Sequence, residues 1–342
     1  MRRPLLRAGV AGAAAASAAA VGAVATSSAK RRQARRRWKS DPDRLGSLHG
    51  EPVPVRADDD VPLYVEVDEP DRPDAGVPTL VFVHGWMLNL DCWHFQRLAF
   101  RGAYRMVFYD QRCHGRSGTS KPDACTIQQL ARDLERVIET VAPNGPLVLI
   151  GHSMGGMTIM EYAKDHSGVM RERVTGIGLL GTSAGDLGQV LPGRAGQLLR
   201  DRAETLFSVG ARAPRLIHAG RRLTGGPAYW ITKRFAFGGD VPPEYSAFAD
   251  AMISASDASV VWDFWPLIAG LDQYASLAAL HDIPVLVIVG SHDLLTPVHH
   301  ARRINELVPS SRVEVIEGAG HLLMLERDED VTKLLAELVR SR

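Results

Sequence analysis

The chain has little cysteine, few aromatic residues and almost no net charge. Its 342 residues include three cysteines, Cys92, Cys113 and Cys125, without a C-x-x-C spacing, so we expect neither a disulfide scaffold nor a zinc site. The thiols are expected to be reduced, with Cys113 as a packing residue. No internal repeat of about 20–50 residues is visible, which argues against solenoids and propellers. A composition of 45% hydrophobic and 23% charged residues instead favours a folded protein with a large core.

The net charge of +1 conceals an uneven distribution. Residues 1–40 contain ten Lys and Arg and no acid, which leaves 30 basic against 39 acidic residues, or −9, for residues 41–342. Proteins bind nucleic acid mainly through clustered positive charge, and the acidic body lacks it. We therefore expect a small-molecule substrate and no nucleic-acid partner.

The amino-terminal segment has the pattern of a targeting or membrane segment. Residues 8–25 carry no charge and are followed by seven basic residues between Lys30 and Lys39. As a helix of about 1.5 Å per residue the segment would just span a bilayer, and the following basic residues favour a membrane anchor with the body in the cytoplasm. Two alternatives stay open: a signal peptide ending near Ala25 in an exported protein, and a leader without a membrane role.

The body alternates short apolar runs with amphipathic stretches. Residues 53–67 predict two strands around an acidic turn, and residues 126–142 and 331–340 have helical spacing. Six further apolar runs predict strands buried on both faces: 79–86, 104–110, 146–153, 174–181, 283–290 and 311–318. This alternation predicts an α/β fold with a doubly wound, mostly parallel sheet.

One region interrupts the alternation. Residues 184–282 contain no strand-like run but hold 11 of the 22 aromatic residues, in helical patterns. We expect a helical cap there, over the carboxyl edge of the sheet, where open α/β sheets bind ligands. The expected organisation is an amino-terminal segment over 1–40, a core formed by 41–183 and 283–342, and a cap over 184–282.

A serine follows the buried run that ends at residue 150. The sequence Gly151-His152-Ser153-Met154-Gly155 lies between this predicted strand and a helical stretch. Such a turn forces its central residue into a strained backbone conformation and needs small neighbours, so that the serine hydroxyl can project into a site. We expect Ser153 to be a nucleophile.

A base and an acid follow in the order expected of this chemistry. His321 lies just after the last predicted strand, and Asp293 follows the strand before it. An imidazole can remove the serine proton, and a carboxylate orients the imidazole. We expect Ser153, Asp293 and His321 to form a catalytic triad that needs no metal and no cofactor. Asp186 and Asp272 are alternative acids.

The oxyanion of such a reaction needs backbone donors. His84-Gly85-Trp86 ends an earlier predicted strand at the same edge, and Gly85 would let the N–H of Trp86 face the N–H of Met154. At this point the sequence resembles the α/β-hydrolase superfamily over residues 50–342. The resemblance extends to the segment from Asp110 to Ser117, which is similar to a D-x-R-G-H-G-x-S loop of the family.

The resemblance implies a fold and a chemistry, with two qualifications. Cys113 stands where the family usually has glycine, whereas Arg112 and His114 are expected to hold the loop together. Ser153 argues against the epoxide-hydrolase and dehalogenase branches, whose nucleophile is aspartate. The sequence from His84 to Trp93 is similar to the cofactor-free haloperoxidase, or perhydrolase, branch.

The resulting expectation is a serine hydrolase acting on carboxylic esters. A perhydrolase or amidase with the same triad, or a non-catalytic binding protein of the same fold, are the alternatives. Nine basic residues in 194–234 against two acids suggest that the cap meets an anionic membrane surface and that the substrate is an acyl lipid or lysolipid. A solvated helical face is the other interpretation of this charge pattern.

Overall fold

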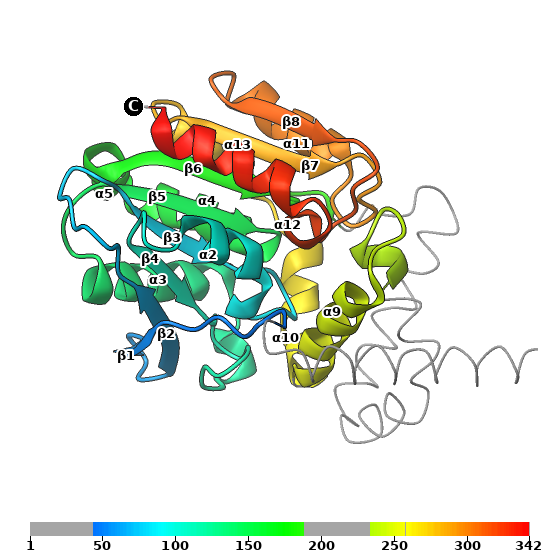
Figure 1. Cartoon of the computed structure of the whole chain (residues 1–342), viewed down its shortest axis with the longest axis horizontal. Helices are drawn as coiled ribbons and strands as arrows, with labels where there is room; N and C mark the ends of the chain where they lie inside the picture. The colour runs from blue at the N-terminus through cyan, green and yellow to red at the C-terminus, as the bar shows by residue number, and fades with distance from the viewer. Residues whose placement is uncertain (1–43, 188–232, 257, 342) are drawn as a thin grey trace, which may run out of the picture.

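A single eight-stranded sheet organises the protein. The computed structural model describes residues 44–187, 233–256 and 258–341. The strands lie in the order β1-β2-β4-β3-β5-β6-β7-β8 (Figure 1). Their bounds are β1 Glu51–Arg56, β2 Pro62–Asp68, β3 Thr79–Val83, β4 Met106–Tyr109, β5 Leu147–His152, β6 Val174–Leu180, β7 Val285–Gly290 and β8 Arg312–Ile316. Each predicted apolar run therefore contains a strand.

The sheet is parallel except at one edge. β1 pairs antiparallel with β2, and β2 pairs antiparallel with β4, whereas β4 and the other strands pair in parallel. The predicted doubly wound, mostly parallel sheet is thus confirmed. The expectation of two buried faces is wrong for β8: its residues are half-buried or exposed, because β8 is the edge strand and pairs with β7 alone.

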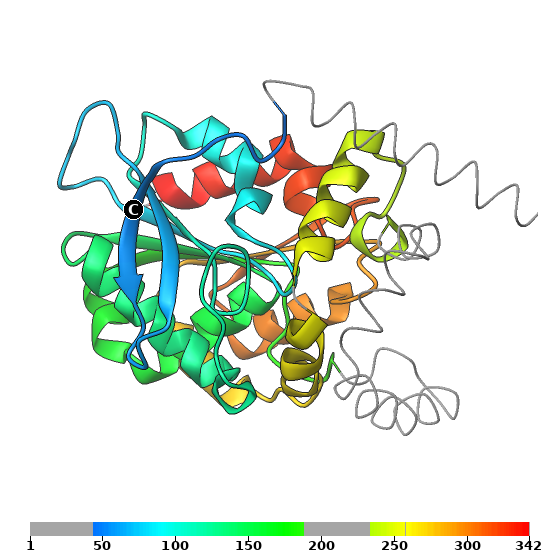
Figure 2. The ribbon, with the colours of Figure 1, turned by 90° about the horizontal axis from the view of Figure 1, so that it is seen from below.

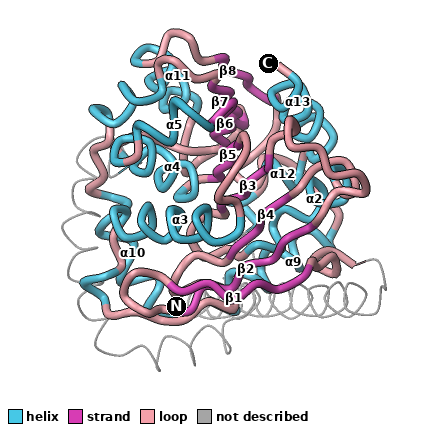
Figure 3. Tube along the Cα trace, turned by 90° about the vertical axis from the view of Figure 1, so that its left-hand side faces the viewer, coloured by secondary structure: helices cyan, strands magenta, loops and turns pink. Residues whose placement is uncertain are grey.

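Helices cover both faces of the sheet. α3 Ile127–Val141, α4 Met154–Asp165 and α11 Val298–Leu307 pack on one face, and α2 His94–Phe100, α12 Leu323–Glu326 and α13 Asp328–Arg340 lie on the other (Figure 3). Figure 2 shows α13 and α4 on opposite sides of the strands. Alternate strand residues enter the two cores: Val81 packs toward α3 and α4, and Phe82 toward α2 and α12.

The remaining elements are short or lie beyond the sheet. α5 Ser167–Arg173 leads into β6, and α9 Pro243–Ala255 and α10 Ala258–Ala269 lie beyond one end of the strands (Figure 1). In the part of the chain that the structure describes, the 3-10 helices are η1 Leu90–Trp93, η2 Pro122–Ala124 and η4 Tyr274–Leu280. Thus the described part of 184–282 is helical, with an isolated bridge between Gly185 and Asp272.

Two sequence-based expectations lie outside the described residues. The amino-terminal segment, residues 1–40, is one, and the part of the basic cluster between Arg194 and Arg222 is the other. Within the described ranges, no helix is both long and apolar enough to cross a bilayer.

Candidate active site

Ser153 occupies a strained turn between β5 and α4. Its backbone has φ +52° and ψ −118°, a combination that a non-glycine residue rarely adopts. Three glycines make the turn possible. A Cβ on Gly151 would lie 2.6 Å from backbone atoms of Gly155, a Cβ on Gly155 would meet the carbonyl of His84, and a Cβ on Gly156 would lie 2.7 Å from Thr182 Oγ1. The close packing of these glycines therefore fixes where the Ser153 side chain emerges.

His321 and Asp293 are joined by a hydrogen bond at the same edge of the sheet. His321 lies in the loop between β8 and α12, Asp293 follows β7, and Nδ1 of His321 is 2.8 Å from Oδ2 of Asp293. Because the carboxylate accepts, Nδ1 carries the proton and Nε2 is left as the basic nitrogen. Both side chains are buried.

Asp293 is held as a carboxylate by several donors. Its Oδ1 accepts from the N–H groups of Leu295 and Thr296, and its Oδ2 accepts from Thr296 Oγ1 at 2.7 Å. Burial alone would raise the pKa of Asp293, but the interaction with His321 and the hydrogen bonds from Thr296 outweigh burial and hold that pKa well below its usual range. Asp293 is therefore charged at neutral pH.

One cavity brings Ser153 and His321 together. It has a volume of about 180 Å³, and both residues line it. The Ser153 hydroxyl makes no hydrogen bond to another described residue, so its proton is free to face His321 or a substrate. In enzymes without bound substrate, the hydrogen bond between nucleophile and base is often long and shortens when the substrate binds. The other walls that the structure describes are mostly apolar. They include residues of the chain after β3, of α4, and of α9 and α10, namely Trp86, Met87, Leu88, Met157, Ile253, Trp265 and Ile268, together with Leu187, Phe235, Ala236, Leu295 and Leu322.

The chain after β3 lies directly against the serine turn. A Cβ on Gly85 would be 2.7 Å from His152 Nδ1 and 3.1 Å from Ser153 Cβ, so the two segments are in contact. The backbone N–H groups of Trp86 and Met154 donate no hydrogen bond to any other residue in the described ranges. Both predicted oxyanion donors thus belong to segments that meet at Ser153, and both N–H groups are free.

Buried hydrogen bonds hold this chain in place. His84 Nε2 accepts the N–H of Gln111 at 2.9 Å, and the Gln111 amide donates back to the carbonyl oxygen of His84 at 2.6 Å. The Gln111 side chain also accepts from Thr158 Oγ1 on α4. Burial lowers the pKa of His84 well below its usual range, so this ring is neutral and can accept.

Arg112 and His114 support the loop after β4, as the sequence suggests. Arg112 is fully buried and forms bidentate ion pairs with Asp133 and Asp59, with N–O distances of 2.6–2.9 Å. His114 donates through Nδ1 to the carbonyl oxygen of Arg112. Neither side chain lines the cavity at Ser153.

The two alternative acids form hydrogen bonds with Tyr274. Asp186 accepts a hydrogen bond from the Tyr274 hydroxyl at 2.7 Å, and Asp272 accepts from the Tyr274 N–H. The geometry therefore favours Asp293 as the partner of His321.

The described helices beyond the sheet contact the chain after β3. Trp86 Nε1 donates to the carbonyl oxygen of Val260 in α10 at 3.1 Å, and the rings of Trp86 and Trp265 stack with centroids 5.7 Å apart. Ser256 donates to the carbonyl oxygen of Met87. One wall of the cavity is thus tied to the chain that carries the Trp86 N–H.

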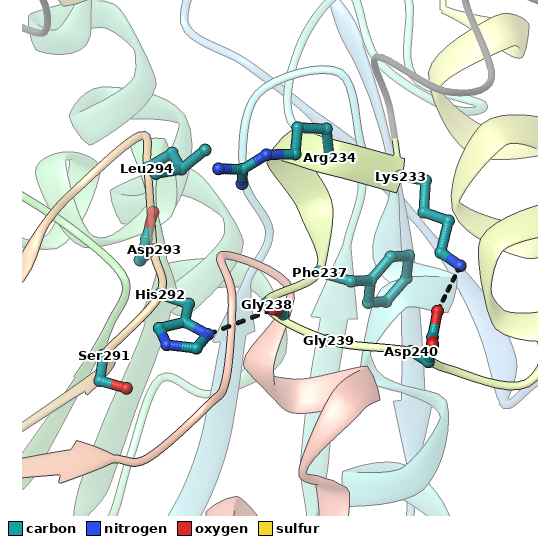
Figure 4. Close-up of a pocket in the computed structure, with 10 residues that line it drawn as sticks. All are labelled: Lys233, Arg234, Phe237, Gly238, Gly239, Asp240, Ser291, His292, Asp293 and Leu294. Atoms are coloured by element: carbon teal, nitrogen blue, oxygen red, sulfur yellow. Dashed lines mark hydrogen bonds and ion pairs between the residues drawn. The ribbon is translucent and has the colours of Figure 1, made fainter.

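A second cavity, of about 650 Å³, is lined by Asp293 and its neighbours and by residues between Lys233 and Asp240 (Figure 4). Lys233 pairs with Asp240 at 2.9 Å there, and His292 is hydrogen-bonded to the carbonyl oxygen of Gly238. Figure 4 shows the guanidinium of Arg234 pointing toward Leu294. This cavity borders residue 232, where the described chain is interrupted, and Ser153 does not line it.

Sequence reasoning missed three supporting residues. Thr296 donates to Asp293, Gln111 holds His84, and His152 Nε2 donates to the carbonyl oxygen of His321 at 3.0 Å. Burial lowers the pKa of His152 to about 3, which keeps its ring neutral. Only the long-range contacts identify these roles. Within the described residues, no three His, Cys, Asp or Glu side chains are arranged to hold a metal ion.

Three comparisons relate the chain to known proteins. The model of the family described as alpha/beta hydrolase fold matches residues 78–328. A non-heme chloroperoxidase, CPO-A1 of Kitasatospora aureofaciens, is 26% identical over 272 residues, with 73% of this chain and 88% of that protein covered. Epoxide hydrolase A of Mycobacterium tuberculosis is 27% identical over 318 residues, with 80% and 92% covered. A solved thermophilic esterase from Thermogutta terrifontis superposes with a TM-score of 0.67 at 24% identity, covering 85% of this chain and 98% of that one.

Proposed function

Because the chain belongs to the alpha/beta hydrolase family, we propose that it is a serine hydrolase that cleaves carboxylic esters through an acyl-enzyme on Ser153. The observation that carries this proposal is the Asp293–His321 hydrogen bond of 2.8 Å, at the edge of the cavity onto which the strained Ser153 opens. Ser153 would be the nucleophile, His321 the base and Asp293 the orienting acid.

In the first half of the reaction, His321 Nε2 takes the proton of Ser153 as Oγ attacks the acyl carbon. The carbonyl electrons move onto oxygen, and the N–H groups of Trp86 and Met154 stabilise that oxyanion, each contributing about 3 kcal/mol. The oxyanion then collapses and the C–O bond to the alcohol breaks. The alcohol leaves with the proton from His321, and the acyl-enzyme remains.

In the second half, His321 takes a proton from water as the water oxygen attacks the acyl carbon. Collapse of the second oxyanion releases the carboxylic acid, and the proton on His321 returns to Ser153. The charged Asp293 carboxylate stabilises the imidazolium that forms in both halves. The net reaction is ester plus water to acid plus alcohol.

The cavity supports an apolar acyl group. A volume of about 180 Å³ is smaller than the roughly 300–1,000 Å³ of a typical ligand pocket, so it fits one part of a substrate. Among the described residues that line it there is no Asp, Glu, Lys or Arg side chain. A charged acyl group would be desolvated there without a partner, which is costly. We place the acyl chain against Trp265 and Ile268, and propose that residues 184–282 act as the cap.

A perhydrolase activity is the second candidate. The observation that favours it is the similarity to a non-heme chloroperoxidase. In that reaction hydrogen peroxide replaces water in the attack on the acyl-enzyme and gives a peracid. The ratio of peracid to acid formed from one ester, measured over a series of peroxide concentrations, separates the two activities.

We also propose an amino-terminal membrane anchor and an amphiphilic ester substrate. The support is the uncharged run of residues 8–25 and the basic cluster of 194–234. Membranes from cells that express the full chain should retain the enzyme after high-salt and alkaline washing. Release by high salt alone would indicate a peripheral contact, and full release without washing would contradict the anchor.

The deciding experiment is labelling by a fluorophosphonate probe, combined with turnover of p-nitrophenyl esters. Wild-type protein should be labelled once, and Ser153→Ala should lose labelling and at least roughly 10³-fold in kcat. A matched control is Ser183→Ala, because Ser183 Oγ lies 2.8 Å from His300 Nδ1 but this serine is fully buried. Labelling that persists in Ser153→Ala, or is lost only in Ser183→Ala, would overturn the assignment. A protein that is folded but never labelled would indicate a non-catalytic binding protein.

A further inference from the structure

Two cysteines that do not line the cavity at Ser153 lie next to each other in the structure. Cys113 is in the loop after β4, Cys125 caps η2, and their sulfur atoms are 3.7 Å apart. Ser120 lies between them: its hydroxyl is 3.3 Å from the sulfur of Cys113 and 3.5 Å from that of Cys125. Both thiols are free. A disulfide needs the sulfur atoms only about 1.7 Å closer, since an S–S bond is about 2.05 Å long.

The surroundings of Cys113 favour its thiolate. The thiol of Cys125 can donate to it, and so can the hydroxyl and the N–H of Ser120, the latter at 3.3 Å. The hydrogen bond from Cys125 lowers the pKa of Cys113 to about 6 against the opposing effect of burial, with further help from Ser120. The same hydrogen bond and burial raise the pKa of Cys125. One partner is therefore a nucleophile at neutral pH and the other a protonated donor.

The backbone of Cys113 adds an independent observation. Its φ is +65°, in the left-handed region that disfavours residues with a side chain. In this conformation the Cys113 sulfur lies next to Ser120 Oγ and the Cys125 sulfur, and residue 113 is only half-buried. Cys113 is therefore the more exposed of the cysteines, since Cys125 and Cys92 are buried, at 2% and 0% exposure.

We propose that Cys113 and Cys125 form a reversible disulfide on reaction with a hydroperoxide. The Cys113 thiolate attacks one peroxide oxygen, the O–O bond breaks, and hydrogen peroxide yields Cys113 sulfenic acid and hydroxide, which takes up a proton. Cys125 then loses its proton and its sulfur attacks the sulfenic sulfur, so that the S–S bond forms and the sulfenic oxygen leaves as water. Two thiols and one peroxide give one disulfide and two waters. The pair is thus a redox modification site, and it does not depend on the proposed ester chemistry.

The test counts thiols in the full chain before and after one equivalent of hydrogen peroxide. We expect the free thiols of the unfolded, quenched protein to fall from three to one and to return to three with dithiothreitol. Peptide mapping without reduction should find one intramolecular link, between the peptides of Cys113 and Cys125. Three persisting thiols, a link through Cys92, or a link between two chains would overturn the proposal.

Variants separate the two roles. Cys125→Ser should stop at Cys113 sulfenic acid, which dimedone traps, and Cys113→Ser should lose its thiols at least tenfold more slowly than wild type. Cys92→Ser is the matched control and should still form the link. Equal rates in Cys113→Ser and wild type would contradict the assignment of the nucleophile. Ser153→Ala should form the link as wild type does, so a failure of the ester proposal leaves this result intact.

Discussion

The backbone of Gly85 lies against the ring of His152, so that a Cβ on residue 85 would be 2.7 Å from His152 Nδ1. The same Cβ would be 3.1 Å from the Cβ of Ser153. Real Cβ atoms almost never come this close to a neighbour, so the chain after β3 can touch the serine turn only because residue 85 has no side chain. This contact sets the position of the Trp86 N–H relative to Ser153.

We therefore predict that Gly85→Ala lowers kcat by about 10²-fold, because the Trp86 N–H moves away from the developing oxyanion. KM should change less, since the apolar cavity remains. Gly168→Ala is the matched control: a Cβ on Gly168 of α5 meets nothing within 4 Å. Circular dichroism of both variants checks that they are folded. Unchanged kcat in a folded Gly85→Ala protein would contradict the role of the Trp86 N–H.

Replacement of the proposed acid should separate catalysis from folding. In Asp293→Asn the side-chain oxygen can still accept from the N–H groups of Leu295 and Thr296, so we expect a folded protein. The carboxylate that orients His321 and stabilises its cation is lost, and kcat should fall by roughly 10³-fold or more. Asp186→Asn, which alters the hydrogen bond with Tyr274, should keep kcat within about threefold of wild type. If Asp186→Asn lost kcat and Asp293→Asn kept it, the acid would be Asp186.

Shortening one wall of the cavity should change the preference for acyl length. Trp265 stacks on Trp86 and lines the cavity, so Trp265→Ala enlarges it without touching Ser153 or His321. We predict that kcat/KM across p-nitrophenyl esters peaks at short to medium chains in wild type and at longer chains in Trp265→Ala. Phe235→Ala is the control, because Phe235 lines the same cavity but is 40% exposed. An unchanged optimum in both variants would place the acyl group elsewhere.

The sequence predicted the strands and the candidate residues because these depend on local patterns. Apolar runs marked each strand, and glycines at 151 and 155 marked the turn at Ser153, where a side chain would collide with nearby backbone. The position of Asp293 followed from the same logic, since parallel strands end at one edge. The strand β8 was predicted, but its partial exposure at the edge of the sheet was not, because its apolar run resembles that of a central strand.

Long-range contacts were beyond prediction from one sequence. The hydrogen bond from His152 to the carbonyl oxygen of His321 joins residues 169 positions apart, and that from Gln96 to the carbonyl oxygen of Met324 joins residues 228 apart. Cys113 and Cys125 are closer in sequence, but their contact depends on the left-handed backbone of Cys113, which its residue type does not suggest. The sequence therefore indicated the proposed reacting groups better than the residues that hold them.

The buried ring of His114 makes a prediction about stability and pH. Its Nδ1 donates to the carbonyl oxygen of Arg112, and the ring packs between those of His84 and Phe264, with centroids 5.3 Å from each. Burial lowers the pKa of His114 to about 4 from a usual value near 6.5. Between these two pH values the unfolded chain binds the proton and the folded protein does not, so the free energy of unfolding falls as the pH falls.

Replacing this ring by phenylalanine should remove that dependence. At pH 7, His114→Phe loses one hydrogen bond and should be about 1 kcal/mol less stable than wild type. At pH 5 the lowered pKa of His114 reduces the free energy of unfolding of the wild-type protein by roughly 2 kcal/mol. The variant has no such loss, so at pH 5 it should be as stable as the wild type or more stable. Urea unfolding at pH 5, 7 and 8 measures this, and between pH 7 and 8 the difference should stay constant. Parallel loss of stability in both proteins from pH 7 to 5 would mean that His114 is protonated in the folded state.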